Sequence, residues 1–156
     1  MKMRFDELIE SLGSLIGVQL RVDDAGVCAL AVKDMKLTLQ DLPETDSIGL
    51  LGEIGEPPPQ HLEDLLSAML NANHCFRGTG GATISRDPDT GRFFLCRMLD
   101  ARAVDGDGFF KALESFVNTQ ETWCRMLADY RGSAAKSAPD AEERPPAFGG
   151  DGFISV

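Results

Sequence analysis

Residues 82–99 read ATISRDPDTGRFFLCRML, and this stretch predicts an antiparallel β-hairpin. Ala82–Arg86 and Phe93–Leu99 have the composition of two strands, with β-branched or aromatic residues in each. Asp87–Gly91 lies between them and holds Asp, Pro and Gly, which are residues that turns favour. Two strands joined by so short a turn pair with each other, so we expect an antiparallel sheet.

Four further strand candidates precede this hairpin. Val18–Val22 alternates apolar and polar residues and is followed by turn residues. Val27–Val32 is apolar at nearly every position, which predicts a strand covered on both faces. Lys36–Gln40 alternates again, whereas Ser47–Ile54 is a weaker candidate because two glycines interrupt it.

Three segments have the apolar spacing of amphipathic helices. Residues 5–13 follow the i, i+3, i+4, i+7 pattern, and the glycine at position 13 is predicted to end the helix. Residues 62–73 repeat the pattern after a run of three prolines. Residues 109–127 form the third stripe, with Asp107 predicted to cap its start and Gly132 to close its end.

The order of elements predicts an α+β fold. A helix, three or four strands, a helix, two strands and a final helix give an antiparallel sheet that three helices cover. We expect residues 1–131 to form this domain and residues 132–156 to form a flexible linker with an apolar C-terminal tail. The segment 148–156 is apolar again, and two interpretations of it stay open: disorder, or docking of the tail in a groove of the protein.

Charge narrows the classes of partner. The chain has 25 acidic and 15 basic residues and a formal net charge of −10. Nucleic acid and anionic membranes require cationic patches, so we expect neither as a partner. No apolar stretch approaches the length of a membrane span, and acidic residues interrupt the N-terminal segment, which predicts a cytoplasmic protein. The cysteines show no short pairing and are predicted to be free thiols: Cys28, Cys75, Cys96 and Cys124.

No motif predicts catalysis, a metal or a cofactor. The glycine-rich stretch Arg77–Thr83 lacks the lysine of a phosphate-binding loop and precedes a strand, so we interpret it as a helix-to-strand turn. His61 and His74 lie thirteen positions apart at opposite ends of one predicted helix and cannot share a metal ion there. We therefore expect a protein that binds another protein and is not an enzyme.

Four stretches of the sequence carry a resemblance to a known family: Leu8–Gly13, Asp23–Leu30, Leu66–Asn73 and Ala82–Ser85. Together with the order of helices, strands and turns, they resemble the CesT-type (Tir chaperone) family of class I type III secretion chaperones. The resemblance covers roughly residues 3–131 and includes the long final helix. It implies a homodimer without a cofactor that holds the N-terminal segment of a secreted effector protein in an extended state.

Two surfaces are expected to carry this function. The first helix and the strands after it hold more apolar residues than docking requires, which predicts a client site. The second helix is predicted to form the dimer interface. The client-site candidates are Leu12, Leu15, Ile16, Leu20, Leu37 and Leu39, and the dimer candidates are Leu62, Leu65, Leu66, Met69 and Leu70.

Two alternative functions stay open at this point. A protein of the same fold could act as a regulator that sequesters a small signalling protein. A small enzyme would instead place His61 or His74 in a deep pocket with a perturbed pKa.

Overall fold

The structure of the protein is a computed structural model, which describes residues 4–137. The predicted α+β order is confirmed, with three strands between the first two helices. Of the predicted linker and tail, residues 138–156 lie outside the described residues, whereas residues 132–137 belong to the final helix. The elements are α1 (Phe5–Ile16), β1 (Val27–Val32), β2 (Met35–Leu42), β3 (Ser47–Gly55), α2 (Leu62–Asn73), β4 (Thr83–Arg86), β5 (Phe93–Asp100) and α3 (Gly106–Ser137), with short 3₁₀ turns at Pro43–Thr45 and His74–Phe76.

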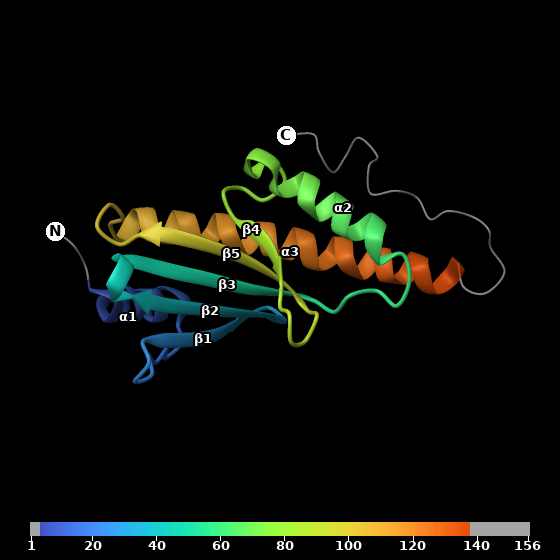
Figure 1. Cartoon of the computed structure of the whole chain (residues 1–156). Helices are drawn as coiled ribbons and strands as arrows, with labels where there is room; N and C mark the ends of the chain where they lie inside the picture. Colours follow the sequence, from blue (N-terminus) through green and yellow to red (C-terminus); the bar gives the residue numbers. More distant parts are fainter. Residues whose placement is uncertain (1–3, 138–156) are drawn as a thin grey trace.

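The five strands form one antiparallel sheet in the order β1-β2-β3-β5-β4. Figure 1 shows α1 and α3 behind this sheet, with the second half of α3 running beyond its end and α2 beside that half. The predicted hairpin is the β4–β5 pair, whose turn is held by the Asp87 side chain. Hydrogen bonds from Thr90 and the Asp89 main chain lower the pKa of the Asp87 carboxyl.

The core lies between the sheet and the two helices behind it. Alternate residues of the central strands point toward the helices, and most residues of this set are apolar and buried. Burial of this surface is the main source of stability. Its fully buried members include Leu8 and Ile9 of α1, Leu37, Leu39 and Leu50 of the sheet, and Phe109, Phe116 and Trp123 of α3.

One buried amide fixes α3 on the sheet. The Nε2 group of Gln120 donates to the main-chain oxygen of Lys36 at 2.9 Å and to that of Glu53 at 3.0 Å. The pairing of β2 with β3 runs only as far as Leu37 and Gly52, so the amide satisfies two carbonyls just where the strands separate. Gly52 makes this approach possible, because a Cβ atom there would lie 2.5 Å from the Gln120 amide carbon.

The second half of α3 holds both ends of α2. Trp123 donates its indole N–H to the main-chain oxygen of Gly78, beyond the C-terminal end of α2, at 2.9 Å. Tyr130 donates its hydroxyl to the main-chain oxygen of His61, just before the N-terminal end, at 2.5 Å. These bonds fix α2 along α3, and its buried residues are Leu65, Met69 and Ala72.

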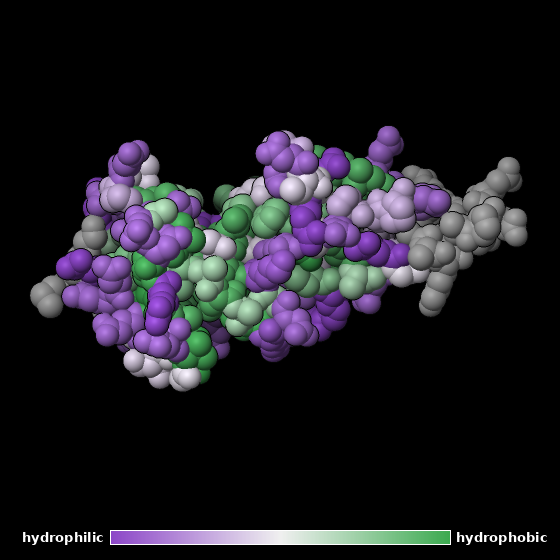
Figure 2. Space-filling view, turned by 90° about the horizontal axis from the view of Figure 1, so that it is seen from below, coloured by the Kyte–Doolittle hydropathy of each residue, from purple (hydrophilic) through white to green (hydrophobic). Residues whose placement is uncertain are grey.

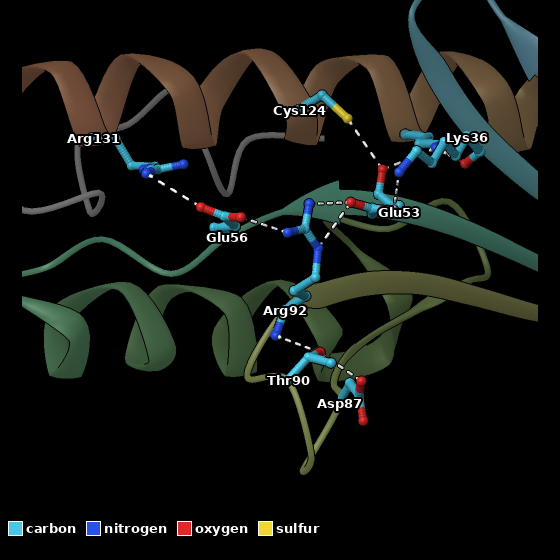
Figure 3. Close-up of polar contacts among 9 residues, drawn as sticks. Lys36, Glu53, Glu56, Asp87, Thr90, Arg92, Cys124 and Arg131 are labelled. Carbon is cyan, nitrogen blue, oxygen red and sulfur yellow. Dashed lines mark hydrogen bonds and ion pairs between the residues drawn. The ribbon is translucent and has the colours of Figure 1, made fainter.

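A network of ion pairs joins the sheet to the same region (Figure 3). Arg92, which directly precedes β5, donates hydrogen bonds to the carboxylates of Glu53 and Glu56. Arg131 of α3 also approaches Glu56, at 3.8 Å, and Lys36 approaches Glu53 at 3.6 Å. The hydrogen bond that Arg92 donates to Glu53, followed by the one that it donates to Glu56, raises the pKa of the Arg92 guanidinium. The network thereby ties the segment before α2 to β5 and α3.

The prediction of a strand at Val18–Val22 is wrong. The chain turns after α1 and passes back along it, and the Val18 N–H donates to the Gly13 main-chain oxygen at 3.0 Å. Leu20 and Val22 are half-buried against the core, which explains the alternation of apolar residues. The alternation therefore reflects one packed side of an extended segment without a strand partner.

The predicted ends of the first and third helices are also wrong. α1 continues through Gly13 and is capped by Gly17, whose φ of 71° glycine adopts without steric cost. Gly13 is needed for a different reason: a Cβ atom there would lie 2.6 Å from the Val18 oxygen. At the start of α3, Asp105 and not Asp107 accepts the capping hydrogen bond, and the helix passes through Gly132 to Ser137.

The prediction that Val27–Val32 is covered on both faces is wrong as well. β1 lies at the edge of the sheet, and Cys28 is buried while Ala29 and Ala31 are exposed. Alanine is small enough to face water at little cost, so an apolar run does not by itself require two covered faces.

Two glycine-to-alanine substitutions test the packing of α3 on the sheet. Gly52→Ala should lower the free energy of unfolding by about 1–3 kcal/mol, because the new methyl group displaces the Gln120 amide. Gly132→Ala should raise it by about 0.5–1 kcal/mol, because no neighbour opposes it and alanine favours helix. Urea unfolding followed by circular dichroism measures both. Equal effects of the two substitutions would contradict the role given to Gln120.

Candidate protein-binding site

An apolar groove lies between α1, the first two strands and the first half of α3. Its volume is ≈ 220 Å³. Strand residues Leu30, Val32 and Leu37 contribute to its walls, and α3 contributes Phe110, Leu113 and Val117. The polar residues that line it, Glu114 and Asn118, come from α3. The groove can therefore receive apolar side chains.

The last turn of α1 leaves large apolar side chains in contact with solvent. Leu15 is 69% exposed and Ile16 is 46% exposed, and both line the groove together with the buried Leu12. Figure 2 views the molecule from the side of α1 and β1, and hydrophobic residues gather there in a band between hydrophilic surfaces. Exposed apolar surface of this kind marks an interaction site.

The open edge of the sheet lies beside the groove. In the antiparallel β1–β2 ladder, pairs of residues that share hydrogen bonds alternate with pairs that do not. The Asp41 N–H donates to the Gly26 oxygen, so the hydrogen-bonded pairs include Gly26, Cys28 and Leu30 on the β1 side. It follows that the main-chain groups of Ala29 and Ala31 point away from β2. Within residues 4–137, no other segment pairs with them. An added strand could bond there while its side chains reach the groove.

The opposite edge of the sheet is covered. Asn73, the last residue of α2, donates its amide to the Ile84 oxygen at 3.1 Å and accepts from the Ile84 N–H at 2.8 Å. This pair of bonds occupies the main chain at the middle of β4, so α2 blocks that edge to another strand. The two edges of the sheet therefore differ in what they can bind.

The structure brings together four of the six predicted client-site residues. Leu12, Leu15, Ile16 and Leu37 line the groove. Leu20 lies against Gly13 of α1, in a separate hollow, and Leu39 is fully buried in the core. Sequence reasoning missed the β1 and α3 walls. Phe110 was the available signal for the α3 wall, because it lies next to the predicted apolar stripe of the third helix and makes that stripe wider. The groove residues that were not predicted are Leu30, Val32, Phe110, Leu113 and Val117.

The predicted dimer residues fall on two sides of α2. Leu65 and Met69 are buried in the core of the protomer. Leu62 and Leu66 are half-buried, and Leu70 is 70% exposed. Phe76, which follows α2 with a positive φ of 57°, is also 55% exposed. The accessible apolar surface of this region is therefore that of Leu66, Leu70 and Phe76.

The two histidines of the described region lie apart. His61 and His74 flank α2 at opposite ends. Among residues 4–137, no three His, Cys, Asp or Glu side chains are placed to hold a metal ion. The glycine-rich turn packs on the helices, since a Cβ at Gly78 would meet Ala72 and one at Gly80 would meet Thr119. None of the helices in this range has the length and apolar character needed to cross a membrane.

The thiols are free and differ in environment. Burial raises the pKa of Cys28, and a hydrogen bond with the Arg21 main chain opposes it. Burial also raises the pKa of Cys124, together with the negative charges of Glu53 and Glu121. Cys75 is exposed.

An antiparallel sheet backed by two helices, with an apolar groove beside an open strand edge, defines a protein-binding α+β domain. Solved chaperone complexes share this fold. A chain of the ExsC–ExsE complex matches with a TM-score of 0.65 and 21% identity over 77% of this chain and 90% of that one. A chain of the HopA1–SchA chaperone–effector complex matches with a TM-score of 0.61 and 18% identity, over 80% of this chain and 93% of that one. The structure of the Yersinia pestis type III secretion chaperone SycH with a fragment of YscM2 matches with a TM-score of 0.60 and 18% identity, over 77% of this chain and 99% of that one.

The family is shown by the sequence itself. The model of the Tir chaperone protein (CesT) family matches residues 7–124. The chain therefore belongs to the Tir chaperone protein (CesT) family, as its pattern of elements predicted. No curated protein sequence matches it.

Thiol labelling tests the placement of the cysteines. Brief treatment with iodoacetamide at pH 8 should modify Cys75 first, because it is exposed. Cys28 and Cys124 should react at least about tenfold more slowly than Cys75, since burial restricts access and the raised pKa leaves little thiolate. Peptide mass spectrometry measures the sites, and the same reaction in urea should remove the difference. Modification of Cys28 as fast as Cys75 would contradict the described core.

Proposed function

We propose that this protein is a cytoplasmic type III secretion chaperone that binds, as a homodimer, an extended N-terminal segment of an effector. The observation that carries the proposal is the open β1 edge beside the apolar groove. Family membership supports the same conclusion. Structures of the same fold include complexes described as chaperone–effector and chaperone–fragment complexes.

The geometry suits an extended segment better than a folded partner. The main-chain groups of Ala29 and Ala31 would bond to an added strand, which gives affinity that does not depend on sequence. Alternate side chains of that strand would enter the groove at Leu15 and Ile16, which gives selectivity for apolar residues. A segment held in this way stays unfolded along its length.

The exposed side of α2 supports the homodimer. Leu70 and Phe76 leave apolar surface near each other in the chain, and Leu66 lies one helical turn before Leu70. Interfaces between identical subunits have apolar cores of this kind. We therefore assign the dimer contact to Leu66, Leu70 and Phe76, whereas Leu65 and Met69 hold α2 within its own protomer.

The client site is tested with a double substitution. Leu15→Asp with Ile16→Asp should weaken binding about a hundredfold or more, because two apolar contacts of about 1.5–3 kcal/mol each are lost. The chain is co-expressed with the N-terminal segment of the large secreted protein encoded nearest to it, and co-purification is measured. Met98→Asp, at a residue 58% exposed elsewhere on the sheet, is the matched control and should leave binding unchanged. Binding that survives the double substitution would contradict the assignment.

The dimer contact is tested by comparing the two sides of α2. Leu70→Asp with Phe76→Ser should give a folded monomer in light scattering, with an unchanged circular dichroism spectrum. Leu65→Asp should instead unfold the protein, because it buries a charge in the core. A double variant that stays dimeric would overturn this contact.

A further inference from the structure

We propose that residues 148–156 of the chain, FGGDGFISV, occupy the apolar groove of their own protomer until a client displaces them. This inference rests on the proposed function, since it assigns an internal competitor to the same site. The segment lies outside the described residues. Three observations lead to the proposal: the length of the chain after α3, the spacing of apolar residues in the segment, and the net charge of the chain.

The chain beyond α3 is long enough to return to the groove. An α-helix rises about 1.5 Å per residue, so Ser137 lies about 36 Å along α3 from Leu113 in the groove. Residues 138–152 can span up to about 50 Å, at no more than about 3.3–3.6 Å each. Residues 153–156 therefore reach the groove with slack for the path around α3.

The pattern of the segment fits an added strand. Ile154 and Val156 flank Ser155, so in an extended chain the two apolar side chains face the same way. At the β1 edge they would point into the groove, where Leu15 and Ile16 are exposed. The main chain of the segment would bond to Ala29 and Ala31, as proposed for a client.

Tethering favours the protomer's own segment over that of a free molecule outside the dimer. Each chain carries a net charge of −10, and residues 138–156 hold four acidic residues and one basic residue. This negative charge opposes the approach of a segment from such a free molecule. A tether of this length gives an effective concentration on the order of a millimolar, far above that of free chains at micromolar concentration. Weak docking is then sufficient to occupy the groove from within.

Such a competitor would set a threshold for clients. A client must bind tightly enough to displace the segment, so apolar sequences that bind weakly would be excluded. Segments that fill both the edge and the groove would still bind, at an affinity reduced by the occupancy of the internal segment.

The test uses full-length chains and a fluorescein-labelled peptide of residues 148–156. Fluorescence anisotropy should show that the variant Ile154→Ser with Val156→Ser binds the peptide about five- to tenfold more tightly than the unchanged protein, because its own segment no longer competes. Adding Leu15→Asp to this variant should abolish the binding. Ser155→Thr, which keeps the apolar face, is the matched control and should behave like the unchanged protein.

Equal affinity for the unchanged protein and the variant would overturn the proposal, as would absence of binding to the variant at about 1 mM peptide. A difference that grows with protein concentration would also overturn it, since the competitor would then be another copy. No effector is present in this assay, so its failure is distinct from that of the proposed function. Failure of the unchanged protein to bind the effector segment in the co-expression test would affect only the chaperone assignment.

Discussion

The position of α3 on the sheet depends on the amide of Gln120. It bonds the oxygens of Lys36 and Glu53 where β2 and β3 separate, and Gly52 gives it room to do so. A buried donor that reaches two carbonyls defines one position along the sheet, whereas apolar packing alone would allow α3 to slide. The contacts of α3 with both ends of α2 and its place in the wall of the groove follow from that position.

The two halves of α3 contact different parts of the protein. The first half faces α1 and the sheet and supplies one wall of the groove through Phe110, Leu113 and Val117. The second half runs beyond the sheet and holds α2 through Trp123 and Tyr130. One helix thus separates the proposed client surface from the proposed dimer surface, and α2 in turn covers the β4 edge through Asn73. The edge at β1 is left for a partner.

The sequence was sufficient for the order of elements and for the class of protein, because turns and apolar spacing are local signals. The β4–β5 hairpin and the apolar stripes of the helices are examples. The sequence was insufficient at Gly13, which does not end the helix; its missing side chain leaves room for the chain that passes back along α1. It was also insufficient at Val18–Val22, where apolar and polar residues alternate although the segment pairs with no strand. These features arise from contacts between segments, which spacing along one segment does not report. The same limit explains the site: Leu39 and Leu15 are both apolar, and only the fold buries one and exposes the other.

The central claim is that a client extends the sheet at β1. It is tested most directly by residue-resolved amide hydrogen exchange, with and without the bound effector segment. In the free protein the amides of Ala29 and Ala31 should exchange rapidly, because they point away from β2, while the amide of Leu30 is already bonded to it. Binding should slow Ala29 and Ala31 by about a hundredfold or more and leave Leu30 little changed. A tightly bound segment that leaves both amides exchanging at the free rate would contradict the account.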